Sequence, residues 1–331
     1  MNKIGVRLPD ETYGYDVSEI VEFAKHAEDY DYHSVWVAEL QGPNGFIILG
    51  QIASETDEIG LGTGIVNVYS RTPALLAMSV ATLDQLSDGR TLLGLAASSK
   101  VTIEQWHGIE YARPLRRVRE TIEIVNEAMA NQRVDYDGDI FTLENYPRSY
   151  ETIRDHVPIY NAALGPTNRK LTGEFADGWL PVHVPRGKFE EFVGEIRESA
   201  ENAGRDPQDV TIAPYVVACV DEDGERARDH VRGLLSFYLG AMDYYAKVFR
   251  EFGFAEDVEA VREAWSAGDR EEAAHRVSDE LLDEIAIGGT PEEGREKLRE
   301  YRELGADVPI VYPPKAPRET IETTIAELGS Y

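Results

Sequence analysis

The sequence predicts an α/β fold in which eight parallel strands alternate with helices and close into a (β/α)8 TIM barrel. Two observations support this prediction. Apolar, β-branched runs recur with helix-like segments between them, and 331 residues match the length that such barrels use as one domain. An open, doubly wound sheet is the alternative. We therefore expect one domain over residues 1–331, with its functional groups at the C-terminal strand ends.

Eight runs have the composition of buried strands: Lys3–Leu8, Ser34–Ala38, Ile59–Val66, Thr91–Ala96, Val157–Ala163, Gly178–Val182, Val210–Val220 and Val308–Tyr312. Helical patterns predict the segments between and after them: Val17–Asp29, Phe46–Glu55, Pro73–Leu86, Leu115–Asn131, Thr167–Phe175, Lys188–Asn202, Pro291–Leu304 and Arg318–Leu328. A long acidic helical stretch, at about 224–284, separates the seventh and eighth strands. It predicts an insertion at the barrel mouth, serving either as a lid or as added structural mass.

Composition and charge exclude several classes of protein. A net charge of −28 and a pI near 4.6 oppose binding to nucleic-acid backbones or anionic membranes. No apolar run approaches the roughly 18 residues of a membrane span. The single cysteine, Cys219, excludes an internal disulfide and a cysteine-based metal cluster. No signal-peptide core precedes the first strand, so we expect a cytoplasmic protein.

The acidic balance also predicts a halophilic protein. Self-repulsion among surface carboxylates opposes the compact state, and salt reduces that repulsion by screening it. The chain keeps an ordinary apolar content, which is typical of a folded domain rather than an acidic disordered one. An acidic enzyme from a mesophile is the alternative.

The stretch Ile59–Leu86 carries the strongest local signal. A buried strand breaks at Gly62-Thr63-Gly64, and a helix then begins with Pro73, where a missing N–H does no harm. The glycines indicate an unusual backbone conformation or a close approach of the backbone to a planar ligand. A glycine bulge at the barrel rim is the alternative.

Other strand ends carry further polar groups. Leu164–Lys170 begins with a glycine turn that opens a helix, whose free N–H groups suit a phosphate, and Arg169 and Lys170 add positive charge nearby. An ordinary helix start is the alternative. The sequence has no dinucleotide fingerprint after the first strand, no Walker loop, no zinc-protease motif and no nucleophile elbow. The seven histidines never fall in metal-ligand spacing, so we expect no metal site.

Several blocks, taken together, resemble the luciferase-like flavin and deazaflavin superfamily. They are VWVAELQGPNGF, TDEIGLGTGIVNVYSRTPALLAMSVATLDQLSDGR, LLGLAASSKVTIEQWHGIEYARPL and ADGWLPVHVP. Within the superfamily they are most similar to the coenzyme F420-dependent oxidoreductases, with the methylenetetrahydromethanopterin reductases closest in general appearance. The similarity is dense over residues 35–125, returns over 158–184 and 289–312, and is thin across the insertion.

The resemblance implies a barrel with coenzyme F420 at its mouth, or FMN as the alternative, acting on a small-molecule substrate in a homodimer. A non-prolyl cis peptide would stand behind the cofactor ring at Gly64-Ile65, and Asn67 would contact the ring. Phosphate contacts would fall on the loops after the fourth and fifth strands: Ala97, Ser98, Thr102, Leu164, Gly165, Thr167 and Asn168.

The chain departs from its relatives at the positions that carry proton transfer. Many relatives place an Asp-His pair after the second strand, where this chain has Glu39 and Leu40. The pterin reductases carry a glutamate in the first strand, where this chain has Arg7. We expect Glu39 and His107 to be catalytic, since a buried carboxylate or an imidazole can exchange a proton. Pairing of Glu39 with a rim arginine, and a structural role for His107, are the alternatives.

The function expected from this resemblance is hydride exchange between the deazaflavin and a small organic substrate, as a reductase or a dehydrogenase. Such chemistry needs no side-chain nucleophile, because the cofactor carries the hydride. A reduced-FMN-dependent monooxygenase is the first alternative, and oxygen consumption would distinguish it. A non-catalytic flavin-binding protein is the second, recognisable by tight cofactor binding without turnover.

Overall fold

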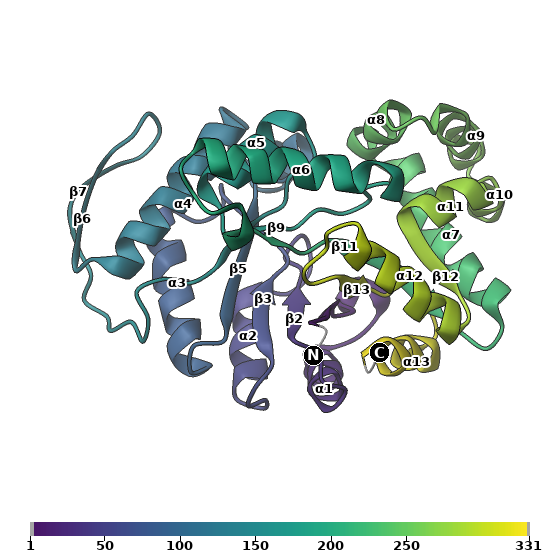
Figure 1. Ribbon diagram of the computed structural model, residues 1–331, viewed down its shortest axis with the longest axis horizontal. Coiled ribbons are helices and arrows are strands. Elements are labelled where there is room, and N and C mark those ends of the chain that lie inside the picture. Colours follow the sequence, from purple (N-terminus) through teal and green to yellow (C-terminus); the bar gives the residue numbers. More distant parts are fainter. Residues whose placement is uncertain (1–2, 330–331) are drawn as a thin grey trace.

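The computed structural model describes residues 3–329, so the ends of the predicted domain, residues 1–2 and 330–331, lie outside it. A curled parallel sheet occupies the centre and helices surround it (Figure 1). Ten of its strands form the barrel: β1 (Gly5–Arg7), β2 (Ser34–Val37), β3 (Gly60–Thr63), β4 (Val66–Asn67), β5 (Thr91–Ala96), β8 (Ile159–Asn161), β9 (Gly178–Trp179), β10 (Thr211–Ile212), β11 (Tyr215–Val220) and β13 (Ile310–Tyr312).

The barrel closes through β10 and β11, which are two pieces of one predicted strand. β10 pairs with β9, whereas β11 pairs with β13, and β13 pairs with β1. Tyr215 adds a parallel bridge to Val182 after β9. β3 and β4 are likewise two pieces of one predicted strand, and both pair with β5. The pairing therefore runs once around eight parallel strand positions and returns to β1, as the sequence predicts.

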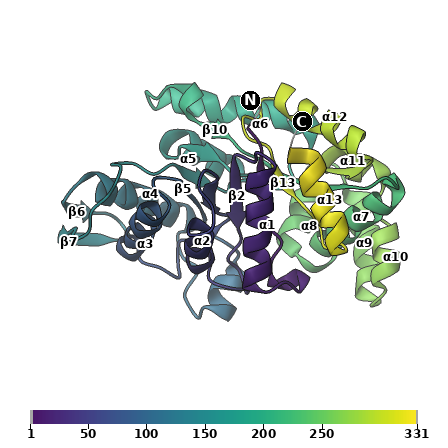
Figure 2. The ribbon, with the colours of Figure 1, turned by 90° about the horizontal axis from the view of Figure 1, so that it is seen from below.

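Helices cover the outside of the barrel. They are α1 (Val17–Asp29), α2 (Gly45–Ala53), α3 (Pro73–Leu86), α4 (Pro114–Ala130), α5 (Pro166–Phe175), α6 (Arg186–Asn202), α12 (Pro291–Glu303) and α13 (Arg318–Gly329), with short helical turns at η1 (Glu11–Tyr13), η2 (Thr102–Trp106) and η3 (Pro207–Asp209). The first and last helices, α1 and α13, lie side by side (Figure 2). Pro73 occupies the first turn of α3 as predicted, and Thr72 caps that helix.

Large side chains fill the barrel interior. Trp36 and Tyr160 meet edge to face, with ring centroids 5.2 Å apart, and Leu180, Ala213 and Ile310 pack with them. Gly62 of β3 faces this cluster, because a Cβ added there would lie 2.4 Å from the Trp36 ring. The first glycine of the Gly62-Thr63-Gly64 break thus makes room for a core tryptophan.

The predicted helical insertion is present between β11 and β13. It consists of α7 (Gly224–Ala241), α8 (Asp243–Glu251), α9 (Ala255–Ser266), α10 (Arg270–His275) and α11 (Asp279–Ile285), and these helices form one flank of the molecule (Figure 1). Their apolar faces share a core that includes Val217 of β11 and Tyr312 of β13. The chain then forms a further strand, β12 (Ala286–Gly289), which pairs with β11.

The sequence analysis did not predict β12 or a hairpin of β6 (Arg133–Asp137) and β7 (Thr142–Pro147), which projects at the opposite flank (Figure 1). The hairpin strands are mostly exposed and polar, so they lack the apolar run that marks a barrel strand. Its tip is held by Glu120, whose buried carboxylate accepts three backbone N–H groups, from Asp139, Ile140 and Phe141. The hairpin is therefore stabilised by a tertiary contact, which a local sequence pattern does not reveal.

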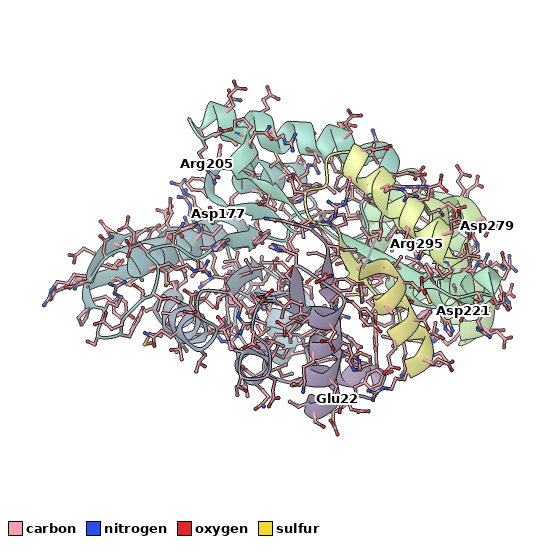
Figure 3. All side chains as sticks on the ribbon, turned by 60° about the horizontal axis from the view of Figure 1, so that its bottom comes forward. Glu22, Asp177, Arg205, Asp221, Asp279 and Arg295 are labelled. Atoms are coloured by element: carbon pink, nitrogen blue, oxygen red, sulfur yellow. The ribbon has the colours of Figure 1, made fainter. Side chains whose placement is uncertain are left out.

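Ion pairs connect many of the outer helices, and Figure 3 labels members of several. Asp279 of α11 binds two arginines of α7, with shortest oxygen–nitrogen distances of 2.9 Å to Arg228 and 2.6 Å to Arg232. Because 61 acidic residues face only 33 basic ones, such pairs leave a net charge of −28. Within residues 3–329, no helix has the length and apolar composition of a membrane-crossing segment.

Candidate functional site

Most of the predicted site residues lie on segments that follow the C-terminal ends of neighbouring strands, beginning with the break in the third strand. β3 ends at Thr63, β4 begins at Val66, and the peptide bond between Gly64 and Ile65 is cis. The N–H of Gly64 still donates to the carbonyl of Val37 in β2, at 2.7 Å. Of the interpretations open for these glycines, an unusual backbone conformation is therefore the one that the structure shows.

Asn67 ends β4 and is buried. Its Oδ1 accepts hydrogen bonds from the backbone N–H groups of Tyr69 (3.0 Å) and Ser70 (2.8 Å). This local turn fixes the amide plane. The NH2 group is then the part of Asn67 that is left to donate to a ligand.

The loop after β5 is ordered by hydrogen bonds to its main chain and between its side chains. Ser98 adopts a left-handed conformation (φ 59°), and its carbonyl accepts a hydrogen bond from Tyr111 Oη at 3.1 Å. Thr102 is buried, and its Oγ1 lies 2.9 Å from Ser99 Oγ. The hydroxyl of Thr102 thus orders the loop that Ala97 and Ser98 form.

The loop after β8 opens α5 as predicted. Gly165 is the N-cap residue and Pro166 follows it, and within the described residues no side chain caps this helix. The carbonyl of Gly165 accepts from the N–H groups of Asn168 and Arg169, and Asn168 Oδ1 accepts from Asn161 Nδ2. Because Pro166 has no N–H, the N–H of Thr167 is the donor of this first turn that remains for a ligand.

The two cations near this helix start do not serve an anion there, which corrects the sequence interpretation. Arg169 is buried, its Nη2 lies 2.6 Å from Glu195 Oε2, and its guanidinium covers the Phe192 ring at 3.6 Å. Lys170 lies 3.7 Å from Glu174 one helical turn away. The two residues follow the turn directly in the sequence, which is why positive charge was predicted there. In the structure the Arg169 side chain packs against α6, and the Lys170 side chain lies along α5.

Glu39 connects two segments at the rim of the barrel, the loop after β4 and the start of α2. Its two carboxylate oxygens accept from Arg71 Nη1 (2.5 Å) and Nη2 (2.8 Å), and Oε2 also accepts from the N–H of Gly45 at the start of α2. The pairing with a rim arginine, one of the two alternatives, is thus the contact present. Its catalytic role stays a prediction.

His107 follows η2, and its backbone N–H donates to the carbonyl of Thr102 at 3.2 Å. The side chain is exposed, and it has no hydrogen-bond or ion-pair partner within residues 3–329. The structure thus places it on the surface beyond the fourth-strand loop. Its catalytic role also stays a prediction.

Across the mouth lies a set of buried and half-buried side chains that the sequence analysis did not assemble. Arg7 of β1 is 9% exposed, and its guanidinium lies 4.3 Å from the ring centre of Tyr312. Tyr312 Oη lies 3.3 Å from Tyr238 Oη of α7, and Tyr215 packs beside Tyr312. The one sequence feature that could have indicated this set is Arg7, a charged residue inside an otherwise apolar first strand.

His183, at the end of the sixth strand, completes this set. It is 1% exposed and left-handed (φ 57°), and the Tyr238 ring lies 4.2 Å from its own, with Tyr245 and Phe249 beyond. Burial lowers the pKa of His183 to about 3, so the imidazole is neutral near pH 7. Burial likewise raises the pKa of Tyr215 and Tyr245 above the ordinary phenol value.

The mouth therefore has two unlike sides. The main-chain side consists of Gly64, Ile65, Asn67, Ala97, Ser98, Thr102, Leu164, Gly165, Thr167 and Asn168. The aromatic side consists of Arg7, Tyr13, His183, Tyr215, Tyr238, Tyr245 and Tyr312. In the described part of the chain, no group of three or more His, Cys, Asp and Glu side chains is arranged to hold a metal ion.

Comparison with protein families matches the family described as Luciferase-like monooxygenase over residues 3–308. The chain belongs to this family. It is 31% identical over 322 residues to a 5,10-methylenetetrahydromethanopterin reductase of Archaeoglobus fulgidus, which covers 95% of this chain and 94% of the relative. It is 24% identical over 350 residues to an F420-dependent glucose-6-phosphate dehydrogenase of Amycolatopsis mediterranei, covering 99% and 97% of the two chains.

The family resemblance extends to the whole fold. The solved structure of the coenzyme F420-dependent tetrahydromethanopterin reductase from Methanopyrus kandleri matches with a TM-score of 0.89 at 26% identity. That match covers 99% of this chain and 97% of the other. The comparison confirms the predicted family and the TIM-barrel fold, with its helical insertion, as that of a luciferase-like protein.

Proposed function

We propose that this chain is a coenzyme F420-dependent oxidoreductase that moves a hydride between the deazaflavin and a small organic substrate. The observation that carries the proposal is the main-chain side of the mouth. It joins the cis peptide at Gly64-Ile65 to an uncapped helix start at Gly165, and strand β5 lies between the two. A planar ring that carries a phosphate fits this combination.

The residues present fit such a cofactor. Gly64 and Ile65 would support the ring, and the NH2 group of Asn67 would donate to its polar edge. The amides of the Ala97-Ser98 loop and of Thr167 in α5 would hold the phosphate, which helix N-termini favour. The bound cofactor would supply the hydride transfer, while the protein would supply orientation and exclusion of water.

Relatives from several enzyme types support F420 over FMN. The names of the Archaeoglobus and Amycolatopsis proteins describe a pterin reductase and a sugar-phosphate dehydrogenase, and the second is F420-dependent by name. These substrates differ widely, so the cofactor chemistry, rather than the substrate, is the part that transfers to this chain.

Cofactor binding tests the proposal most directly. Fluorescence quenching by F420 and by FMN is compared on one preparation in multimolar potassium chloride, and we expect F420 to bind at least ten-fold tighter. A ten-fold preference for FMN would contradict the proposal and favour the monooxygenase, which oxygen consumption with reduced FMN would identify. Tight F420 binding without turnover on a broad substrate panel would identify a non-catalytic protein.

A matched pair of variants tests the helix start. Gly165 has open space where a Cβ would stand, so Gly165→Asp and Gly165→Asn both fit. Either side chain would cap α5 and stabilise it. The aspartate would in addition repel the cofactor phosphate, so F420 affinity should fall further in Gly165→Asp than in Gly165→Asn. Equal F420 affinities in the two variants would show that the cofactor phosphate does not bind at the start of α5.

We also propose a homodimer formed through α2 and α3. These adjacent helices expose Ile47 (73% exposed), Leu86 (61%), Leu75 and Met78. Apolar groups gathered in this way are typical of an association surface. Sedimentation should give a dimer that Leu86→Glu dissociates, whereas Phe237→Glu, which charges an exposed apolar site on α7, should leave it intact.

Finally, we propose a single-domain cytoplasmic enzyme adapted to high salt. The net charge of −28 predicts that low ionic strength destabilises the fold. Circular dichroism should show unfolding below a few hundred millimolar salt. Full stability there would mark an acidic enzyme without halophilic adaptation.

A further inference from the structure

The aromatic side contains polar atoms that are buried and yet have no partner. Within residues 3–329, Arg7 Nη1, Tyr215 Oη and both ring nitrogens of His183 are inaccessible and form no hydrogen bond. Buried polar groups in folded proteins are nearly always satisfied, and leaving one unpaired costs free energy. At such places a bound ligand or an ordered water supplies the missing partner.

Arg7 points into the barrel rather than outward. A Cβ on Gly5 would lie 3.1 Å from Trp36 Nε1, inside the barrel, and side chains two residues apart share a face of a strand. Arg7 therefore faces the interior one layer nearer the mouth. Ile310 belongs to the same interior cluster as Trp36, so Tyr312 lies on the interior face of β13 by the same reasoning.

The guanidinium of Arg7 is held through one of its two terminal nitrogens, Nη2. Its Nη2 donates to Asp10 Oδ2 at 2.7 Å, and the other oxygen of Asp10 accepts from the backbone N–H of Thr12. The Tyr312 ring covers the guanidinium face. This arrangement orients the cation and leaves Nη1 as its free donor.

Tyr215 brings a second donor to the same layer. Its Oη would lie 1.9 Å from a Cβ on Gly64, so the phenol reaches across the barrel to the break in the third strand. Its ring centre is 6.1 Å from that of Tyr312, whose ring Arg7 covers. Burial and raised pKa keep the phenol protonated, and thus a donor, near pH 7.

We propose that Arg7 Nη1 and Tyr215 Oη bind a carboxylate of the substrate, within a wall formed by Tyr13, Tyr238 and Tyr312. The proposal rests on the proposed function, because it makes this wall the substrate side of the mouth. A guanidinium nitrogen and a phenol are both donors, and a carboxylate offers acceptors only. The neighbouring rings favour an acid whose remaining part is unsaturated or aromatic.

Equilibrium binding tests this assignment without turnover. Benzoate, cinnamate and phenylpyruvate are titrated by calorimetry into the wild-type protein in potassium chloride, each beside its primary amide. We expect at least one acid to bind ten-fold tighter than its amide. If no acid of the panel shows this preference, the proposal is overturned.

Three variants locate the preference. Tyr215→Phe removes one buried oxygen that has no partner, so it should not lower the melting temperature, and it should reduce the preference for the acid several-fold. Arg7→Met should abolish the preference. Arg276→Met removes an exposed arginine paired with Glu272 in the insertion, and it should retain the preference.

Because Arg7→Met also leaves Asp10 without its partner, this variant can fail to fold. Tyr215→Phe then decides alone, and an unchanged acid preference in a folded Tyr215→Phe protein overturns the proposal. F420 affinity is measured on the same preparations. If the wild-type protein does not bind F420 but shows an acid preference that depends on Arg7, the proposed function is rejected and this site is retained. If it binds F420 but shows no such preference, the proposed function is retained and this site is rejected.

Discussion

The main-chain side and the aromatic side of the mouth differ in the groups that they direct at the centre of the barrel. The first offers peptide groups: a cis peptide at Gly64-Ile65, a left-handed loop at Ser98 and the open first turn of α5. The second offers long side chains, among them Arg7, Tyr215 and Tyr312, three residues contributed by three strands.

This difference points to separate roles for the two sides. Peptide geometry depends on a few small residues at fixed places, so many substrates can be served by one arrangement of main chain. Long side chains can be exchanged without disturbing the backbone. We infer that the main-chain side carries the common cofactor chemistry and that the aromatic side sets the substrate.

The junction of the two sides should give a large effect on stability. Gly64→Ala would place a methyl group 1.9 Å from Tyr215 Oη, and overpacking of this kind costs about 1–3 kcal/mol. In the double variant with Tyr215→Phe the nearest remaining atoms lie 3.2 Å away, so part of the loss should return. Urea unfolding of the four proteins measures this coupling, and strictly additive losses would contradict the contact.

The Glu39–Arg71 pair should contribute about 1.5–3 kcal/mol, because both of its hydrogen bonds are charged and largely buried. A double-mutant cycle of Glu39→Gln and Arg71→Gln measures this coupling directly. The same variants test the predicted catalytic role. If Glu39 moves a proton, kcat falls in Glu39→Gln while KM is kept, and His107→Gln serves as the parallel test for the second predicted residue.

The pH dependence of stability sharpens the description of the aromatic side. The unfolded state takes up a proton on His183 near pH 6.5, whereas the folded state does so only near pH 3. Stability should therefore fall as the pH drops through this window, by about 1.4 kcal/mol per pH unit, and be unaffected by this group above it.

His183→Asn suits the left-handed backbone and should remove that slope in acid unfolding experiments. His156→Asn is the matched control of opposite sign. A hydrogen bond to Asp177 raises the pKa of His156, so its contribution is present below about pH 6.5 and is lost as the pH rises through its folded-state value. If the slope of stability against pH is unchanged in His183→Asn, the pKa of His183 is not lowered in the folded state, and the imidazole is in contact with water.

The smallest effect is expected on the main-chain side. Ser98 is left-handed, so Ser98→Gly should stabilise the protein by about 0.5–1 kcal/mol. If the loop contacts the cofactor through peptide groups, the affinity for F420 should change by less than about three-fold. A ten-fold loss would show that the hydroxyl is a ligand, and the contrast between the two sides would no longer hold.

The sequence predicted the barrel from local signals, whereas most residues of the main-chain side were predicted from the family resemblance. Buried strands are apolar, and Gly62, Gly64 and Gly165 mark positions where a side chain is absent. Even so, sequence could not tell that Gly62 makes room for Trp36, since that contact joins two strands. It also could not direct Arg169 away from the helix start, because the partner, Glu195, lies on α6.

The aromatic side could not be predicted because its members are far apart in the chain. Arg7, Tyr215 and Tyr312 meet only after the barrel closes, and each alone is compatible with an ordinary core or surface role. The hairpin at β6 and β7 was missed for a related reason, since Glu120 on α4 supplies its anchor.

The pairing of β12 with β11 brings the two ends of the insertion together. Val220, where the excursion begins, stands beside Gly289, where it ends, and the N–H of Asp221 donates to the Gly289 carbonyl at 3.1 Å. A chain that passed from Val220 to Thr290 would need to bridge only the roughly 5 Å spacing of adjacent strands. Such a junction imposes little closure entropy on the enclosed segment. Helices can therefore be lengthened, exchanged or lost within it while the barrel keeps its connectivity.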